Sequence, residues 1–221
     1  MYAGYSDLIV IRHSKDGAAR LASEYSIKPN TGEIVPVING GDGQNQHPTQ
    51  TMLDLYTIEK ELGKLEGLHI ALVGDLKYGR TTHSLLFGAA MFGMEISLVA
   101  PQQIQMPEKY LVKVKELYDV NPKFHNSIED IISDVDVLYM TRIQKERFPD
   151  INEYRKVANA FVLNSKLMEL AKEKMIVMHP LPRTNEIKPE VDKDKRAAYF
   201  KQAENGVPIR RALMHKVLEV V

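Results

Sequence analysis

The sequence contains no cysteine, so disulfide bonds and metal sites built from thiolates are excluded whatever the fold. Long apolar runs are also absent. The longest apolar segments have the length of one strand, well short of the roughly 20 residues of a membrane-spanning helix. The N-terminus shows no signal-peptide pattern. We therefore predict a cytoplasmic protein without a membrane partner.

Neither sign of charge is in excess. The 29 lysines and arginines balance 29 aspartates and glutamates, which gives a formal net charge of zero. A protein that binds nucleic acid or a membrane surface normally carries a basic excess or a basic patch, so no nucleic acid is expected as a partner. The signatures G-x-G-x-x-G and Gly-Lys-Ser/Thr are missing too. A generic nucleotide-binding α/β domain is therefore kept only as an alternative.

The composition that remains is ordinary for a soluble globular domain. Of the 221 residues, 44% are hydrophobic and 26% are charged, and this length allows one large domain or two small ones. Short β-branched runs alternate with segments of helical spacing, which predicts an α/β fold with a parallel sheet covered on both faces. Strands are expected at residues 8–11, 34–38, 69–73, 96–100, 137–140, 161–163 and 175–178.

Helices are expected between these strands. Ser127 can cap a helix whose isoleucines and Val135 fall on one face, with acidic residues at its positive end. The tail has helical spacing over residues 197–203 and again over 208–220, so two helices are predicted there. The other helices are expected near residues 17–22, 49–62, 80–92, 107–120 and 166–171.

A polar stretch between residues 38 and 57 has the character of a binding site. An apolar run ends in Asn39-Gly40-Gly41-Asp42-Gly43, where glycines permit positive φ and a close approach of a ligand to the backbone. His47 and Gln50 then lie at the opening of a helix that begins at about Pro48. A helix N-terminus attracts anions and presents free N–H groups, so a ligand is predicted here. A capped helix after a polar turn is the alternative.

Arginines follow several of the predicted strands. Arg12, Arg80 and Arg142 occur where a strand gives way to a loop or a helix, and Arg183 comes shortly after His179. Ligands of open α/β sheets bind at the carboxyl ends of the strands, and arginine suits bidentate recognition of carboxylate and phosphate. The sequence therefore predicts a small ligand with several negative charges. For each arginine alone, a solvated loop position is the alternative.

A proline-rich loop follows the last predicted strand. In Met178-His179-Pro180-Leu181-Pro182-Arg183, two prolines flank Leu181 and fix the backbone, so that its carbonyl groups point one way. Such carbonyl groups could accept hydrogen bonds from an amide or an amine. A stiff connector is the alternative.

Four motifs carry a family resemblance when they are taken together: His47-Pro48-Thr49-Gln50 with Asp54 and Thr57, Val73 to Thr81, Tyr139 to Arg147, and His179 to Arg183. They resemble the transcarbamoylases, the aspartate and ornithine carbamoyltransferase family, over nearly the whole chain. The similarity is greatest to catalytic chains of the aspartate branch. Ornithine enzymes resemble the sequence less at Arg142-x-Gln144 and typically carry Cys-Leu-Pro at the proline loop, so an ornithine-type enzyme is an alternative.

The resemblance implies an activity. The family transfers the carbamoyl group of carbamoyl phosphate to the amine of L-aspartate, an early step of pyrimidine biosynthesis. The amine attacks a carbonyl, a tetrahedral oxyanion forms and phosphate leaves, so the enzyme needs oxyanion donors, a phosphate clamp and aligned reactants. The leaving phosphate can accept the amine proton. Neither a metal nor another cofactor is therefore expected.

Site residues on the carbamoyl phosphate side are carried over by resemblance. Arg12, His47 and Gln50 are expected to be catalytic and to bind carbamoyl phosphate, with His47 polarising the carbonyl oxygen and Gln50 holding the carbamoyl amide. Pro180 and Leu181 are expected to contribute to the same subsite, Leu181 through its backbone carbonyl.

The aspartate side is carried over in the same way. Arg80 is expected to bind the α-carboxylate of aspartate, and Arg142 with Gln144 is expected to bind the side-chain carboxylate. The family also implies a cis peptide bond before Pro182.

The resemblance implies two doubly wound α/β domains with parallel sheets, the first one incomplete here. Residues 1–48, joined by a C-terminal helix at 207–221, are expected to form the remainder of a carbamoyl-phosphate-binding domain. Residues 49–62 are expected to be an interdomain helix, and residues 63–195 the aspartate-binding domain. A homotrimer is implied, with or without regulatory chains.

Two family segments are not found in the sequence: a Ser-x-Arg-Thr-Arg phosphate loop and a lysine-bearing loop that reaches a neighbouring subunit's site. Since a charge-assisted hydrogen bond contributes on the order of 1.5–3 kcal/mol, we expect the chain alone to bind carbamoyl phosphate poorly and to turn over slowly or not at all. Uncovered apolar surface on residues 1–48 is expected to favour oligomers or a partner fragment. A non-catalytic aspartate-binding or assembly relative is the alternative from a different class.

Overall fold

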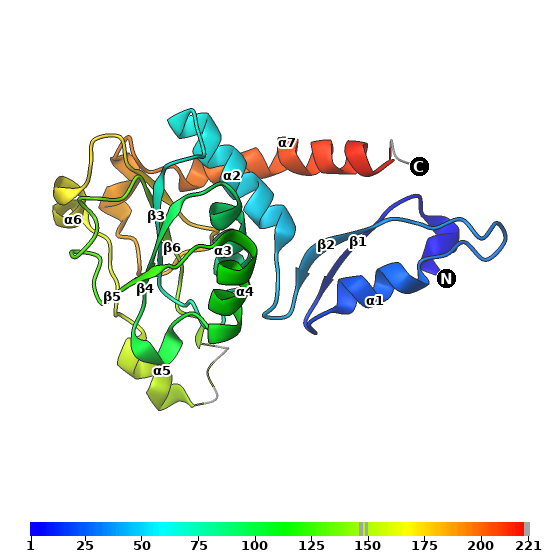
Figure 1. Cartoon of the computed structure of the whole chain (residues 1–221), viewed down its shortest axis with the longest axis horizontal. Coiled ribbons are helices and arrows are strands. Elements are labelled where there is room, and N and C mark those ends of the chain that lie inside the picture. Colours follow the sequence, from blue (N-terminus) through cyan, green and yellow to red (C-terminus); the bar gives the residue numbers. More distant parts are fainter. Residues whose placement is uncertain (146–147, 149, 219–221) are drawn as a thin grey trace.

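The computed structural model describes residues 1–145, 148 and 150–218. Figure 1 shows a large body built around one parallel sheet and a smaller unit that extends from it, built around a second parallel sheet. The predicted α/β fold with parallel sheets is confirmed. In the part of the chain that the structure describes, no helix combines the length and the apolar character needed to cross a membrane.

The sheet of the body has five parallel strands in the order β5-β4-β3-β6-β7. From β3 the chain passes outward to β4 and β5, and then returns to the other side of β3 to form β6 and β7. The switch point of the sheet therefore falls between β3 and β6, where ligands of such sheets bind. The strands are β3 (His69–Val73), β4 (Glu95–Val99), β5 (Lys123–His125), β6 (Val137–Met140) and β7 (Ile176–Met178).

Both faces of this sheet are covered, which explains why its central strands are apolar throughout. Ile70 and Leu72 point to one face and pack with α2, α3 and α4, while Ala71 and Val73 point to the other. The second face is covered by residues 128–135, α6, η4 and the start of α7. The helices are α2 (Pro48–Leu62), α3 (Arg80–Met91), η2 (Gln102–Ile104), α4 (Glu108–Tyr118), α5 (Ile151–Val157), α6 (Ser165–Leu170), η4 (Pro189–Lys193) and α7 (Tyr199–Leu218).

The helix predicted after Ser127 is wrong. Ser127 and Asp130 exchange backbone-to-side-chain hydrogen bonds of 3.2 Å, as a capped helix start would. The predicted apolar face is buried as well. However, the segment forms successive turns, because only about two helical turns fit before β6 begins at Val137, and so short a helix gains little from propagation.

Two strand predictions also fail. No strand forms at residues 161–163, where only Leu163 makes an isolated bridge, to Ile187. By contrast, the edge strand β5 is present although it was not predicted, because its side chains are exposed or half-buried and give no apolar run.

The tail forms one continuous helix, α7, so the prediction of two helices is wrong. Pro208 lies inside it and cannot donate a hydrogen bond to the carbonyl four residues earlier. Side-chain bonds to α2 hold the helix on the N-terminal side of this proline: Gln202 donates to Asp54 and Asn205 donates to Thr57. Residues 219 and 220 of the predicted second helix lie outside the described residues.

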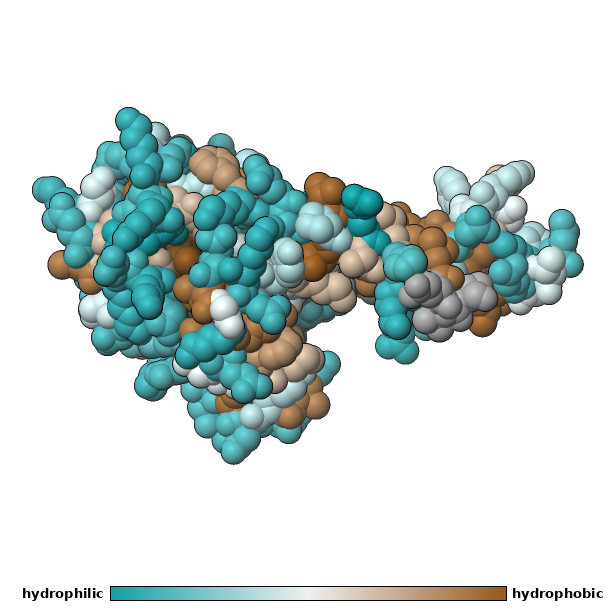
Figure 2. Space-filling view, turned by 90° about the horizontal axis from the view of Figure 1, so that it is seen from above, coloured by the Kyte–Doolittle hydropathy of each residue, from teal (hydrophilic) through white to brown (hydrophobic). Residues whose placement is uncertain are grey.

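The smaller unit consists of η1 (Tyr2–Tyr5), two parallel strands, β1 (Ile9–His13) and β2 (Val37–Asp42), and α1 (Ala18–Tyr25). β2 begins later than predicted, and Ile34 instead bridges to Ile27. Apolar side chains remain exposed here, among them Val10 at 60% and Ile34 at 67%, as expected for this part of the chain. Figure 2 shows apolar surface on this extended unit.

Candidate active site

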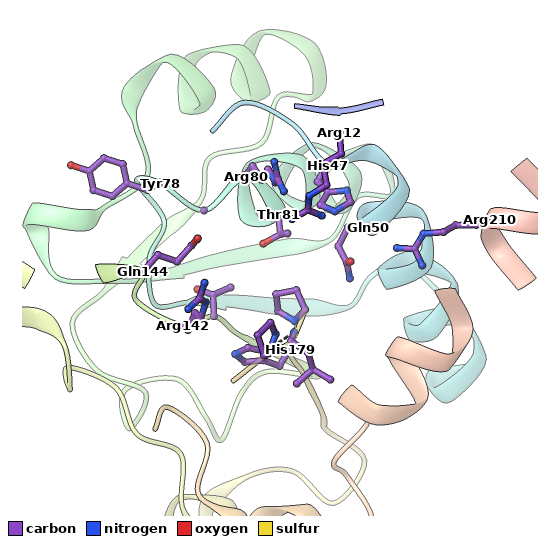
Figure 3. Close-up of a pocket in the computed structure, with 15 residues that line it drawn as sticks. Arg12, His47, Gln50, Tyr78, Arg80, Thr81, Arg142, Gln144, His179 and Arg210 are labelled. Carbon is purple, nitrogen blue, oxygen red and sulfur yellow. Dashed lines mark hydrogen bonds between the residues drawn. The ribbon is translucent and has the colours of Figure 1, made fainter. Parts of the chain in front are cut away.

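A cavity of about 400 Å³ opens at the carboxyl ends of β3 and β6, on the side that faces the smaller unit. All eight site residues predicted from the sequence line it, together with residues that were not predicted (Figure 3). Its lining consists of Arg12, His47, Gln50, Tyr78, Gly79, Arg80, Thr81, Thr141, Arg142, Gln144, His179, Pro180, Leu181, Pro182 and Arg210.

The floor of the cavity depends on the close approach of the ends of β3 and β6. Gly74 follows β3 with a φ of 113°, and a Cβ atom there would lie 2.4 Å from the carbonyl oxygen of Thr141. Only glycine fits at this position. The backbone N–H of Asp75 donates to Thr141 Oγ1 at 3.2 Å. This contact brings the loop before Arg80 next to the residues that follow β6.

Arg80 is the first residue of α3 and lies against the glycine turn of the smaller unit. Its Nη1 donates to the carbonyl of Gly43 at 3.3 Å. A Cβ atom on Gly41 would lie 2.8 Å from the guanidinium carbon of Arg80. The glycines predicted to permit close approach therefore make room for this arginine.

His47 is the N-cap residue of α2 and is buried. Its backbone N–H donates to Ser84 Oγ at 2.8 Å, and that hydroxyl donates to Gln46 at 2.5 Å, so α3 fixes the entry of α2. Burial, and then the positive charges of Arg80 and other nearby arginines, lower the pKa of His47 to about 4. The imidazole is therefore neutral at pH 7.

The side chain of Gln50 is hydrogen-bonded to the fully buried carboxyl group of Asp54. Its Nε2 donates to Asp54 Oδ1 at 2.9 Å. Tyr139 donates to the other oxygen of Asp54 at 2.9 Å, and Gln202 donates to Oδ1 at 2.6 Å. Burial raises the pKa of Asp54 to about 7, although these three hydrogen bonds favour its ionised form.

The proline loop is shaped by a buried histidine. His179 Nδ1 accepts a hydrogen bond from the backbone N–H of Leu181 at 2.8 Å, so Nε2 carries the proton that is shared with Glu186, also at 2.8 Å. Burial alone would raise the pKa of Glu186, but the bonds from His179 and from Thr184 lower it to about 2. The peptide bond between Leu181 and Pro182 is cis, as the resemblance implied.

Family models match both parts of the chain. The model described as "Aspartate/ornithine carbamoyltransferase, Asp/Orn binding domain" matches residues 66–217, and the model of the carbamoyl-P binding domain matches residues 1–60. The chain belongs to the aspartate/ornithine carbamoyltransferase family.

Several relatives within this family are similar at high identity. An aspartate carbamoyltransferase catalytic subunit of Methanococcoides burtonii is 54% identical over 97% of the chain and 67% of the relative. The one of Archaeoglobus fulgidus is 52% identical over 98% of the chain and 68% of the relative. The chain thus spans about two thirds of the length of these transferases.

Solved structures give the same assignment. The catalytic subunit of Methanocaldococcus jannaschii aspartate transcarbamoylase superposes with a TM-score of 0.86 at 48% identity, covering 99% of this chain and 68% of that one. The Trypanosoma cruzi enzyme in complex with N-(phosphonacetyl)-L-aspartic acid gives 0.86 at 40% identity, covering 96% and 66%. The predicted resemblance to aspartate carbamoyltransferase catalytic chains is confirmed, and the ornithine-type, non-catalytic and nucleotide-binding alternatives are not favoured.

Arg183, one of the four arginines predicted to lie at the site of this carbamoyltransferase, does not line the cavity. Arg183 pairs with Asp192 of η4 through both terminal nitrogens, with Nη2 at 2.6 Å from Oδ2, and its Nη1 donates to Tyr199 at 3.1 Å. It lies over the ring of Tyr199 as well. A neighbouring carboxylate on the outer side of the loop therefore holds Arg183 away from the site. Glu146 and Arg147 of the quoted motif lie outside the described residues.

A different arginine lines the cavity of this carbamoyltransferase instead. Arg210 comes from α7 and occupies the space above Gly206, where a Cβ atom would lie 2.2 Å from its Nη1. Nothing in the sequence distinguishes Arg210 from Arg211 beside it. Tyr78, Thr81 and Thr141 were also missed, although all three lie within or beside quoted motifs.

A metal-binding set is not seen at the site of this carbamoyltransferase. Over residues 1–145, 148 and 150–218, no group of three or more histidine, aspartate or glutamate side chains lies in an arrangement that could hold a metal ion. The polar groups of the cavity are chiefly guanidinium, amide, imidazole and backbone carbonyl groups. Such groups bind anions and amides.

Proposed function

We propose that this cavity binds carbamoyl phosphate and L-aspartate side by side and transfers the carbamoyl group to the amine of aspartate. The observation that carries the proposal is the convergence of Arg12, Arg80 and Arg142 with a neutral imidazole, His47, on one cavity of about 400 Å³. Solved structures of the Trypanosoma cruzi aspartate transcarbamoylase are complexes with carbamoyl phosphate, and with carbamoyl phosphate and aspartate, which supports the same ligands here.

The aspartate subsite is proposed at the ends of β3 and β6. Arg80 is assigned to the α-carboxylate, and Arg142 with Gln144 to the side-chain carboxylate. All three line the cavity from the body, Arg80 from the first position of α3 and the other two from the segment after β6. A guanidinium group binds a carboxylate with two parallel hydrogen bonds, so two arginines orient a dicarboxylate and leave its amine in a defined place.

The carbamoyl phosphate subsite is proposed where α2, β1 and the proline loop meet. Arg12 is assigned to the phosphate. His47, which is uncharged at pH 7, is assigned to the carbonyl oxygen, because a neutral imidazole can donate a hydrogen bond to the oxyanion that develops during attack. Gln50 and the carbonyl groups of Pro180 and Leu181 are assigned to the carbamoyl amide.

The assigned groups supply alignment of the two reactants and a hydrogen-bond donor to the oxyanion, without the phosphate loop and the lysine-bearing loop that the resemblance implies. The aspartate nitrogen forms a bond to the carbamoyl carbon, the bond from that carbon to the phosphate oxygen breaks, and the amine proton passes to the leaving phosphate. The cavity then has to align the two reactants and to stabilise negative charge on the carbonyl oxygen. No side chain of the cavity has to act as a general base.

We also propose the division of the chain given by the resemblance. Residues 1–48, with the helix at 207–221, belong to the carbamoyl-phosphate-binding side, 49–62 connect the two sides, and 63–195 form the aspartate-binding domain; residues 219–221 lie outside the described residues. A cytoplasmic homotrimer is proposed, and the exposed apolar side chains of the smaller unit favour such self-association. Analytical ultracentrifugation tests it: a monomer at micromolar concentration would contradict the trimer.

Calorimetry with N-(phosphonacetyl)-L-aspartate tests the function, because this compound presents the phosphonate and both carboxylates at once. Binding is expected to be tighter than that of succinate or phosphate alone. Arg142→Ala should weaken it by on the order of 100-fold, since a charge-assisted bidentate contact is lost. Arg155→Ala, in the exposed part of α5, is the matched control and should not change affinity. No binding by the unmodified chain would overturn the proposal.

A further inference from the structure

Asp54 is a buried carboxyl group that lies behind the cavity and does not line it. Its three described hydrogen-bond partners all donate: Gln50, Gln202 and Tyr139. Each of the three comes from a different element, namely α2, α7 and β6. When it is ionised, Asp54 can only accept, so it then dictates which end of each amide faces it.

For Gln50 this constraint decides which atom is offered to a ligand. With Nε2 held on Asp54 at 2.9 Å, the amide oxygen is the end left for the cavity that Gln50 lines. The reverse orientation would bring the amide oxygen against a carboxylate oxygen, two acceptors without a proton between them. In Figure 3 the Gln50 side chain extends from α2 toward the loop that carries His179.

The same carboxylate also reaches the proline loop. Gln202 donates to Asp54 through Nε2, and its Oε1 accepts from the backbone N–H of His179 at 2.8 Å. His179 in turn accepts from the N–H of Leu181. The amide oxygen of Gln50 and the carbonyl groups of this loop are therefore positioned from one buried anchor.

We propose that Asp54 is a positioning residue that makes the cavity selective for a transferable group bearing an –NH₂, by turning the oxygen of Gln50 and the carbonyl groups of the proline loop toward it. This inference rests on the proposed function. Asp54 contacts no substrate itself. A carbamoyl group offers two N–H donors to these acceptors, whereas an acetyl group offers a methyl that cannot donate to them, which costs affinity.

The experiment compares two phosphonates that differ in one group. Phosphonoacetamide carries –CO–NH₂ and acetonylphosphonate carries –CO–CH₃ on the same phosphonate arm. Calorimetry gives the ratio of their affinities, and the unmodified chain is expected to favour the amide by about tenfold. The ratio is internal to each protein, so a general loss of stability does not move it.

Two substitutions of Asp54 separate positioning from packing. Asp54→Ala removes the acceptor, frees the Gln50 amide to turn, and should reduce the ratio to about one. Asp54→Asn is the matched control that should retain most of the preference, because its oxygen can still accept from Gln50 and Gln202 while Tyr139 turns to accept from its nitrogen. A preserved preference in a folded Asp54→Ala, or no preference in the unmodified chain, would overturn the proposal.

A measurement on the unmodified chain keeps the inference testable if Asp54→Ala does not fold. The Gln50 side-chain NH₂ signals, identified as those missing from Gln50→Met, should exchange with solvent at least tenfold more slowly than those of the exposed Gln102 and Gln103. Fast exchange would overturn the proposal. Failure to bind N-(phosphonacetyl)-L-aspartate at all would instead count against the proposed function, which keeps the two failures distinct.

Discussion

The two units of the molecule differ in how completely their strands are buried. In the body, every residue of β6 is buried, and apolar side chains pack on both faces of the sheet. In the smaller unit, β1 has no fully buried residue and Val10 is 60% exposed. The groups assigned to aspartate come from the body, whereas Arg12 comes from the smaller unit. The side of the cavity assigned to aspartate therefore belongs to the more completely buried unit.

The largest change in stability is expected from a substitution in the buried core of the body. Leu72 lies in β3, the central strand of the sheet, and is fully buried, so Leu72→Ala should lower the free energy of unfolding by about 2–5 kcal/mol, through lost burial and the cavity left behind. The corresponding change in the smaller unit, Val10→Ala, should cost no more than about 0.5 kcal/mol. Urea unfolding measures both. Equal costs would show that the two units are not packed differently.

The next effect concerns a carboxyl group inside the body. Because the pKa of Asp54 is about 7 in the folded chain and ordinarily 3.8, the folded form binds more protons between these pH values, and stability falls as the pH rises through this window. From pH 5 to pH 8 the loss from this group is on the order of 3 kcal/mol. Asp54→Asn should remove that component of the urea-unfolding slope. An unchanged slope would contradict the raised pKa.

His47, where the smaller unit meets the body, should act in the opposite direction. Its pKa is about 4 in the folded chain and ordinarily 6.5, so the unfolded form binds more protons and stability rises as the pH increases from about 4 to about 6.5. Between pH 5 and pH 8 the gain is on the order of 2 kcal/mol. His47→Gln should abolish it in urea unfolding. NMR titration of the imidazole gives the pKa directly, and a value near 6.5 would refute the expectation.

The smallest effect tests the link between the units. Gly206→Ala places a methyl group where the Arg210 guanidinium lies, so Arg210 must move. Stability should change by less than about 1 kcal/mol, since alanine also favours the helix. Calorimetric affinity for N-(phosphonacetyl)-L-aspartate should fall by roughly threefold to tenfold. Val207→Ala, the next residue on α7, is the control and should bind normally.

Sequence patterns predicted the parts of the fold that depend on local periodicity and on motifs. The buried strands β3, β4 and β6 and the helix α2 were found because their apolar patterns are strong, and all of these except β4 also adjoin or contain a quoted motif. The exposed edge strand β5 gave no apolar run, and residues 128–135 have the periodicity of a helix without the length for one. Periodicity does not reveal how much length is available to a helix, because that length depends on where the next strand begins.

The cavity was predictable to the extent that its residues lie in motifs at the ends of strands. Arg183 was assigned wrongly because its partner, Asp192, becomes a neighbour only through the fold. Arg210 was missed for the converse reason: it reaches the cavity from the last helix, 130 positions after Arg80 in the sequence. Long-range neighbours of this kind leave no local pattern.

The unbroken course of α7 limits how the two units can move. The helix is bonded to the body at Gln202, and Arg210, which lines the cavity, lies about 12 Å further along the helix axis at 1.5 Å per residue. A tilt of about 10° around the fixed end would displace the guanidinium by about 2 Å. Because one continuous helix joins the two residues, any tilt of α7 at Gln202 would also displace the Arg210 guanidinium that lines the cavity.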